Sequence, residues 1–399
     1  MKTTKSVGAG KFEVYDLFMS LLIVASLSFY DIKPFFLGTQ AIAFMMTFMQ
    51  YVKYGKIKFG ILTKCISWVA IFCLYSFGSF FWAKEVNITV ISSSFSVLQV
   101  GLITICIISY GKTNERLKKL LFSFVLAAVL LCIRFLITIP ISSWGQSQRF
   151  SQNTIFGSNN PALVLSYASL ILMWMFLKRK KSVTSVVLLT LVAVFMFISM
   201  MTGTKKGILI FAIGVTVFVI GKQKKPYKLV GSLFLIAFMV FVGYRLITEI
   251  PILYGSIGYR VEQMIAGLSG GDGDGSTEMR MLFSQDAFRV FLENPILGIG
   301  QDGYRYLNPY EFTYSHNNYA ELLCNLGLVG CSIFYSFYVL LLKKSFMLRE
   351  TTLFPLGIIL TIIIVDVAIV SYSHEVIYVL IGIVAAVLFQ DEKTDQCIV

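Results

Sequence analysis

One histidine is the residue best suited to chemistry in this chain. His316, one of two histidines, lies in Ser315-His316-Asn317-Asn318-Tyr319, where a polar stretch from about Leu246 to Asn318 meets a new apolar run. An imidazole with a pKa near ~6.5 can take a proton from a hydroxyl group at neutral pH. We therefore treat His316 as a candidate general base. The alternative is that it only orients the start of the following helix through Asn317.

The segment before His316 is expected to hold an amphipathic helix over 278–293. Its apolar residues recur at helical spacing and would face the membrane or the helix bundle: Met279, Leu282, Phe283, Ala287, Val290 and Phe291. Arg280 and Arg289 flank that face, and Pro295 should end the helix because proline cannot continue it. The glycines at 298, 300 and 303 predict a tight turn, and the Gly- and Asp-rich run at 268–276 predicts a flexible linker.

The elements that must position these residues are membrane helices. Hydrophobic residues make up 57% of the chain and charged residues 14%, and the mean hydropathy is +0.77. Such a composition indicates an all-α polytopic membrane protein, since a helix needs roughly 20 apolar residues to cross a bilayer. We expect about 12 transmembrane helices, at 14-30, 34-52, 60-82, 88-110, 120-140, 160-177, 183-201, 207-221, 229-245, 319-342, 353-371 and 376-390.

The distribution of lysine and arginine predicts the orientation of these spans. Basic residues gather in alternate loops, at 2-11, 53-58, 112-119, 178-181, 222-228 and 343-349. Basic loops stay in the cytoplasm, so both termini should lie inside and the large loop between spans nine and ten outside. The domain division is then 1-245 (spans one to nine), 246-318 (the extracytoplasmic loop with the candidate motifs) and 319-399 (three further spans and an inner tail). The net charge of +13 reflects this topology and not nucleic-acid binding.

The order of several residues around His316 resembles the signature of the O-antigen ligase and polysaccharide repeat-unit polymerase family. The resemblance is strongest over about 276–335, and these residues carry it: Arg280, Asn294-Pro295, Gly298-Ile299-Gly300, His316-Asn317-x-Tyr319, Gly327 and Gly330. Two weaker similarities lie upstream. One is Arg149-Phe150 followed by Phe156-Gly157 and Asn159-Asn160-Pro161, and the other is Thr202-Gly203-Thr204-Lys205-Lys206-Gly207, where lysines replace the usual arginine.

This resemblance implies glycosyl transfer outside the cytoplasmic membrane of a bacterium, from a glycan on polyprenyl pyrophosphate. The catalytic candidates are His316 and Arg280. The substrate-binding candidates are Arg149, Lys205, Lys206, Asn317, Tyr319, Arg289 and His374. Cations suit a pyrophosphate leaving group because they neutralise its growing negative charge. The expected partners are the lipid-linked oligosaccharide, membrane lipid and, as candidates, flippase and chain-length regulator proteins; no cofactor or metal is implied.

Three function classes remain open from the sequence. A polymerase would extend lipid-linked repeat units into capsule, O-antigen or exopolysaccharide, whereas a ligase would pass the glycan to another acceptor. We favour the polymerase because no feature points to a lipid A core acceptor. A secondary transporter also commonly has about twelve spans, but we find no half-to-half similarity. A non-catalytic scaffold of an export complex is the third class.

Each basic candidate also has a purely structural interpretation. Arg280 could pair with Glu278 or Asp286, Arg289 could be a surface contact, and Lys205 and Lys206 could extend along the helix to the membrane interface. Two charged residues in the outer halves of predicted spans, Arg134 and Asp366, could pair with each other or form a second ring around the donor.

Overall fold

The computed structural model describes residues 13–54, 60–84, 88–145, 159–178, 183–268 and 275–395, and these form helices and no strand. The longer helices are α1 (Val14–Ser28), α2 (Lys33–Tyr54), α3 (Ile61–Gly78), α4 (Ile88–Tyr110), α5 (Asn114–Thr138), α6 (Asn159–Lys178), α7 (Val183–Met201), α8 (Lys205–Ile220), α9 (Pro226–Glu249), α11 (Tyr259–Leu268), α12 (Gly275–Glu293), α14 (Asn318–Met347), α15 (Phe354–Val365) and α16 (Glu375–Asp395). Short pieces are η1 (Ser79–Phe81), η2 (Ile141–Ser143), α10 (Pro251–Leu253), η4 (Tyr254–Gly258) and α13 (Tyr304–Leu307).

The chain is an all-α polytopic membrane protein. Within the described ranges, eight helices are long and apolar enough to cross a membrane: α2, α3 with η1, α4, α5, α6, α7, α9 and α14. The shorter apolar helices α1, α15 and α16 coincide with three more predicted spans, and the 16-residue α8 coincides with the remaining one. The number of twelve spans stays a prediction.

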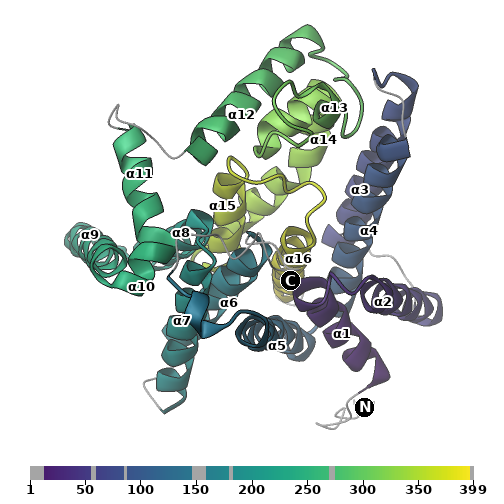
Figure 1. The fold of residues 1–399 in the computed structure, drawn as a ribbon. Coiled ribbons are helices and arrows are strands. Elements are labelled where there is room, and N and C mark those ends of the chain that lie inside the picture. Colours follow the sequence, from purple (N-terminus) through teal and green to yellow (C-terminus); the bar gives the residue numbers. More distant parts are fainter. Residues whose placement is uncertain are drawn as a thin grey trace, which may run out of the picture.

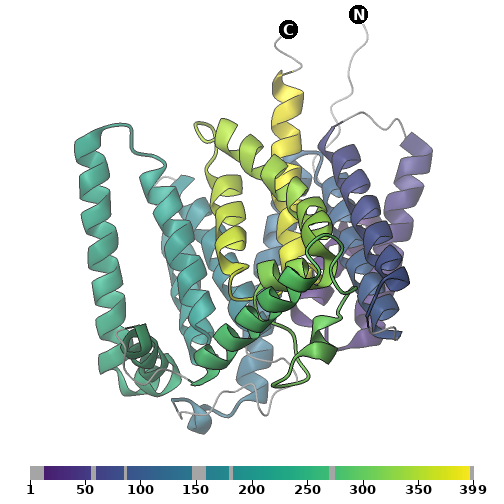
Figure 2. The ribbon, with the colours of Figure 1, turned by 90° about the horizontal axis from the view of Figure 1, so that it is seen from above.

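Helix α16 lies at the centre of the bundle and packs against α1, α3, α4, α5, α6, α14 and α15 (Figure 1). Its first half is apolar on every face, which is typical of a helix buried on all sides. Gly382 allows α4 to approach closely, because a Cβ at this position would lie 2.9 Å from the Ile107 Cβ. Helix α9, by contrast, stands at the edge of the bundle with most of its apolar side chains exposed (Figure 2).

The described parts of several predicted inner loops lie at one end of the bundle. Arg116 in the first turn of α5 pairs with Glu13 before α1 at 2.9 Å, and Lys224 of the α8–α9 turn pairs with Glu350 of the α14–α15 turn at 2.7 Å. Gln390 near the end of α16 donates to the Gly111 carbonyl. Figure 2 shows these turns at one end, with α12 and α13 toward the other. The described residues of these turns thus lie at one end of the bundle, which is the arrangement that the positive-inside rule predicts for cytoplasmic loops.

The segment 246–318 is more helical than predicted. The predicted helix 278–293 is present as α12, but α11 was not expected, and α9 continues to Glu249. Of the predicted linker 268–276, residues 269–274 lie outside the described residues, and its ends belong to α11 and α12. Helix α12 packs against α14 through a small core that includes Ala287, Val290 and Ala320.

Two expectations about the spans were wrong. The predicted span 353–371 ends as a helix at Val365, so Asp366 follows the helix and accepts a hydrogen bond from Tyr335 at 2.9 Å. Arg134 does not pair with Asp366. It forms a salt bridge with Asp31 at 2.9 Å because α5 packs against α1, and Asp31 lies in the turn that follows α1.

Candidate active site

The turn between α7 and α8 presents two lysines at the start of a helix. Gly203 takes a left-handed backbone conformation (φ +68°), and a Cβ there would lie 3.1 Å from the Ser256 carbonyl oxygen. Thr204 then precedes α8, so Lys205 and Lys206 occupy its first two positions. A Cβ at Gly207 would collide with the hydroxyls of Ser199 and Ser166, so this glycine allows α8 to pack tightly on α6 and α7. The Thr-Gly-Thr-Lys-Lys-Gly sequence therefore shapes the turn that positions the lysines.

The second element is the turn that carries His316. Its backbone has φ +61°, a conformation uncommon for a residue other than glycine. The turn is held from behind, since the buried Glu321 carboxylate accepts a hydrogen bond from the Ser315 amide at 2.7 Å. Asn317 is the N-cap of α14, and its side-chain oxygen accepts from the Tyr319 and Ala320 amides. Asn317 itself therefore caps α14, and this cap fixes the backbone next to His316.

Aromatic rings define the orientation of the His316 imidazole. The Phe283 ring of α12 lies 6.1 Å away, centroid to centroid, and nearly parallel to it. The Tyr314 ring lies 4.3 Å away on a tilted plane. The imidazole is half-buried between these groups. Burial raises the pKa of the Tyr314 phenol, so this ring stays neutral beside His316.

Both turns open into one cavity of about 550 Å³. Its lining includes residues in the first turns of α6, α8 and α12, the turn before α14 with its N-cap Asn317, residues of α11 and the segment after α15. The polar side chains that line it are Asn159, Thr204, Lys205, Lys206, Arg260, Ser276, Thr277, Arg280, Ser284, His316 and Asn317. Leu209, Met264, Met281, Val367 and Ala368 form its apolar part.

The cavity is strongly electropositive. Among its described lining residues are two lysines and two arginines and no aspartate or glutamate. Helix N-termini add partial positive charge because their first amides have no partner within the helix. The Lys206 side chain is nearly buried, with 6% of the residue exposed, while Lys205 donates to the Thr277 hydroxyl at 3.1 Å. This surrounding suits a phosphate or pyrophosphate group. No set of three or more His, Cys, Asp or Glu residues in the described ranges could hold a metal ion.

The structure brings together five of the predicted site residues. His316, Arg280, Lys205, Lys206 and Asn317 line the cavity. Arg149 lies outside the described residues.

Three other predicted residues do not line the cavity. Arg289 is exposed and pairs with Asp286 at 2.7 Å, which fits its interpretation as a surface contact. Tyr319 donates to the Ile363 carbonyl at 2.8 Å and stacks on Tyr335, so it joins α14 to α15.

His374 lies just before α16, beside the cavity's lysine turn. It is half-buried, and within the described structure its Nδ1 atom has no hydrogen-bond partner. Burial lowers the pKa of His374, and the positive charge of Lys206 lowers it further against the opposing effect of Glu375. The ring is therefore mostly neutral at pH 7.

Sequence reasoning missed Arg260 and Glu321. Arg260 reaches the cavity from α11, where its guanidinium lies close to Gly203, and α11 was not predicted. The one available signal was an arginine in a short amphipathic segment of the outer loop. Glu321 is fully buried and accepts from Ser315 and Asn325. A carboxylate five residues after a candidate base, on the buried face of the next helix, is the pattern that could have identified it.

The residues that match a known protein family include most of the cavity lining. Residues 197–335 match the family model described as O-Antigen ligase, from the end of α7 to the middle of α14. Asn159, Val367 and Ala368 are the described lining residues outside the match. No curated protein matches the chain. The resemblance predicted from the sequence is therefore confirmed over this region.

Proposed function

We propose that this chain, whose residues 197–335 form an O-antigen ligase domain, polymerises polyprenyl-pyrophosphate-linked oligosaccharide repeat units into a surface polysaccharide. One observation supports this most: His316 and four cationic side chains line one cavity inside that domain. A base and a phosphate-binding surface in one cavity are what glycosyl transfer from a lipid pyrophosphate needs. The loop at 246–318 supplies most of these groups, and the bundle at 1–245 and 319–399 supports it.

The donor would bind with its pyrophosphate against the cations. Lys206, Arg260 and Arg280 reach the cavity from three separate helices, so they can contact different phosphate oxygens. The apolar side chains of Leu209, Met264 and the others on the same lining suit the first isoprene units of the lipid. The donor is thus recognised through both parts of its lipid-pyrophosphate group.

The reaction is a direct displacement with inversion at the anomeric carbon. A hydroxyl oxygen of the acceptor glycan forms the new bond to this carbon while the bond to the pyrophosphate oxygen breaks. The hydroxyl proton passes to the His316 imidazole, and polyprenyl pyrophosphate leaves with its added charge neutralised by the lysines and arginines. General-base assistance of this kind supplies about 10²- to 10⁴-fold in rate.

This chemistry belongs at the outer face of a bacterial cytoplasmic membrane. The described basic turns lie at the end of the bundle that we assign to the cytoplasm, as do Glu13 before α1 and Gln390 near the end of α16. The candidate site then faces outward, where flippase and chain-length regulator proteins would supply the donor and set the product length. Capsule, O-antigen and exopolysaccharide are all products that such an enzyme could make.

Reconstitution with a defined lipid-linked repeat unit tests this function. A polymerase makes a ladder of lipid-linked products from this donor alone. A ligase leaves the donor unchanged until another acceptor is added, and a transporter only moves it across the vesicle membrane. We expect the ladder; either of the other results would refute the proposal.

A further inference from the structure

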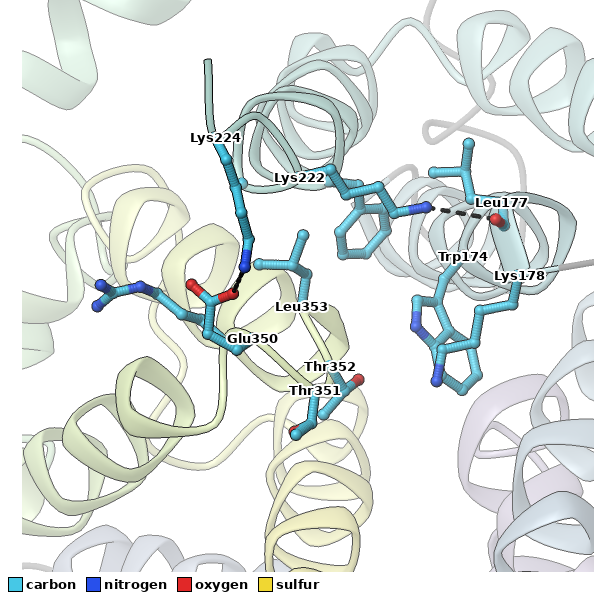
Figure 3. A pocket seen from close by; sticks show the side chains of 12 residues that line it. Trp174, Leu177, Lys178, Lys222, Lys224, Glu350, Thr351, Thr352 and Leu353 are labelled. Atoms are coloured by element: carbon cyan, nitrogen blue, oxygen red, sulfur yellow. Dashed lines mark hydrogen bonds and ion pairs between the residues drawn. The ribbon is translucent and has the colours of Figure 1, made fainter. Parts of the chain in front are cut away.

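A second basic pocket lies at the opposite end of the bundle from the candidate active site. It has a volume of about 200 Å³ and is formed by the end of α6, the α8–α9 turn and the α14–α15 turn. Figure 3 shows Lys222 and Lys224 on one side and Thr351, Thr352 and Trp174 on the other. The glycan-transfer proposal gives this pocket no role.

The charges of the pocket favour an anion. Its described lining holds Lys178, Lys222, Lys224 and Arg349 against a single acidic residue, Glu350. Glu350 pairs with Lys224 at 2.7 Å, but both side chains are more than half exposed, so this pair is weak and easily exchanged. Lys222 donates to the Leu177 carbonyl at the end of α6, which keeps its ammonium group at the pocket.

The pocket also has uncharged groups, which would suit a ligand that carries an anionic group on an otherwise apolar molecule. The indole nitrogen of Trp174 is buried, and the described residues offer it no hydrogen-bond acceptor. Phe218 and Leu353 are buried and give the pocket an apolar side. A phosphate oxygen would offer the indole an acceptor and contact the cations, while the rest of a phospholipid would extend from the pocket along the neighbouring apolar helices.

The position of the pocket also favours a lipid. Apolar helices end or begin on every side of it, at Lys178, Ile220, Pro226, Met347 and Phe354. These boundaries are where a bilayer's headgroups lie, and basic pockets between helices at that level bind anionic headgroups. We infer that this pocket binds the phosphate group of an anionic phospholipid, with the acyl chains along the outer faces of the neighbouring helices.

Native mass spectrometry of the full-length protein, delipidated in a neutral detergent, tests this inference. The protein is titrated with phosphatidylglycerol and, separately, with phosphatidylcholine. Each cation near an anionic lipid contributes about fivefold in affinity, so Lys222→Gln/Lys224→Gln should weaken phosphatidylglycerol binding about 30-fold. The matched control is Lys225→Gln/Lys228→Gln, which removes the same charge next to this turn at residues that do not line the pocket. It should weaken binding less than about fivefold.

A third variant distinguishes loss of charge from loss of folding as the cause of weaker phosphatidylglycerol binding. Glu350→Gln removes the acidic group and should strengthen phosphatidylglycerol binding about fivefold, which a misfolded protein would not do. Equal losses in the two double variants would overturn the inference, as would equal binding of phosphatidylcholine. Displacement of the lipid by an equal concentration of glycerol phosphate would show that the pocket takes a soluble phosphate, and would overturn the lipid assignment.

Discussion

Replacing Lys205 and Lys206 one at a time by methionine tests whether a buried cation contributes more to the transfer rate than a half-exposed one. Both begin α8 and line the cavity, but Lys206 is 6% exposed, whereas Lys205 is half-buried and donates to Thr277. Methionine keeps much of the apolar stem and removes the charge. Because a buried charge is less screened, we expect Lys206 to contribute more to the stabilisation of the leaving pyrophosphate.

The burial of each lysine sets the magnitude of the expected loss. A cation about 4 Å from a phosphate charge contributes about 4 kcal/mol at an effective dielectric constant near 20, but about 1 kcal/mol in water. Lys206→Met should therefore lower the transfer rate by up to about 10³-fold, and Lys205→Met by about fivefold.

The assay is a single-turnover measurement of repeat-unit transfer by the reconstituted protein at saturating donor. Thermal unfolding in detergent shows whether each variant is folded. Equal losses in the two variants, or a larger loss for Lys205→Met, would refute the reasoning, because the pyrophosphate would then lie at the exposed side of the turn.

Three further expectations follow from the site. Arg280→Gln should lower the transfer rate at least tenfold, whereas Arg289→Gln, which removes an exposed partner of Asp286, should change it less than about twofold. Asn317→Ala removes the cap of α14 and should cost about 1 kcal/mol of stability, seen as a lower unfolding midpoint. The pKa of His374 is lowered in the folded state, so the unfolded chain binds this proton more readily and stability falls as the pH drops below ~6.5. The slope is at most about 1.4 kcal/mol per pH unit, and His374→Gln should flatten it in unfolding curves between pH 5.5 and 8; identical curves would exclude this titration.

The local features of the site could be predicted from the sequence because they depend on neighbouring residues. Helical spacing predicted α12, and the glycines at 298 and 300 do take left-handed conformations, with φ of +72° and +101°. The order of motifs also pointed to His316, Arg280 and the lysine pair, which meet in one cavity. The helix and the turn needed only the chain's local chemistry, whereas the choice of Arg280 and the lysine pair rested on the family resemblance.

Other features depend on which helices pack together. Arg134 pairs with Asp31 and not with Asp366, because α5 lies against α1. Tyr319 follows Asn317 of the cavity lining by two residues, but its hydroxyl donates to the Ile363 carbonyl of α15. Arg260 reaches the site from a helix that the sequence did not reveal. Side-chain direction depends on tertiary packing, which a single sequence does not contain.

The rate of repeat-unit transfer by His316→Ala tests the central claim most directly. The reconstituted variant, shown by its unfolding curve to be folded, is given the same lipid-linked donor and acceptor as the wild type. If His316 removes the proton of the attacking hydroxyl, the rate falls about 10²- to 10⁴-fold while the donor still binds to the cations. A folded His316→Ala protein that makes product at the wild-type rate would contradict the account.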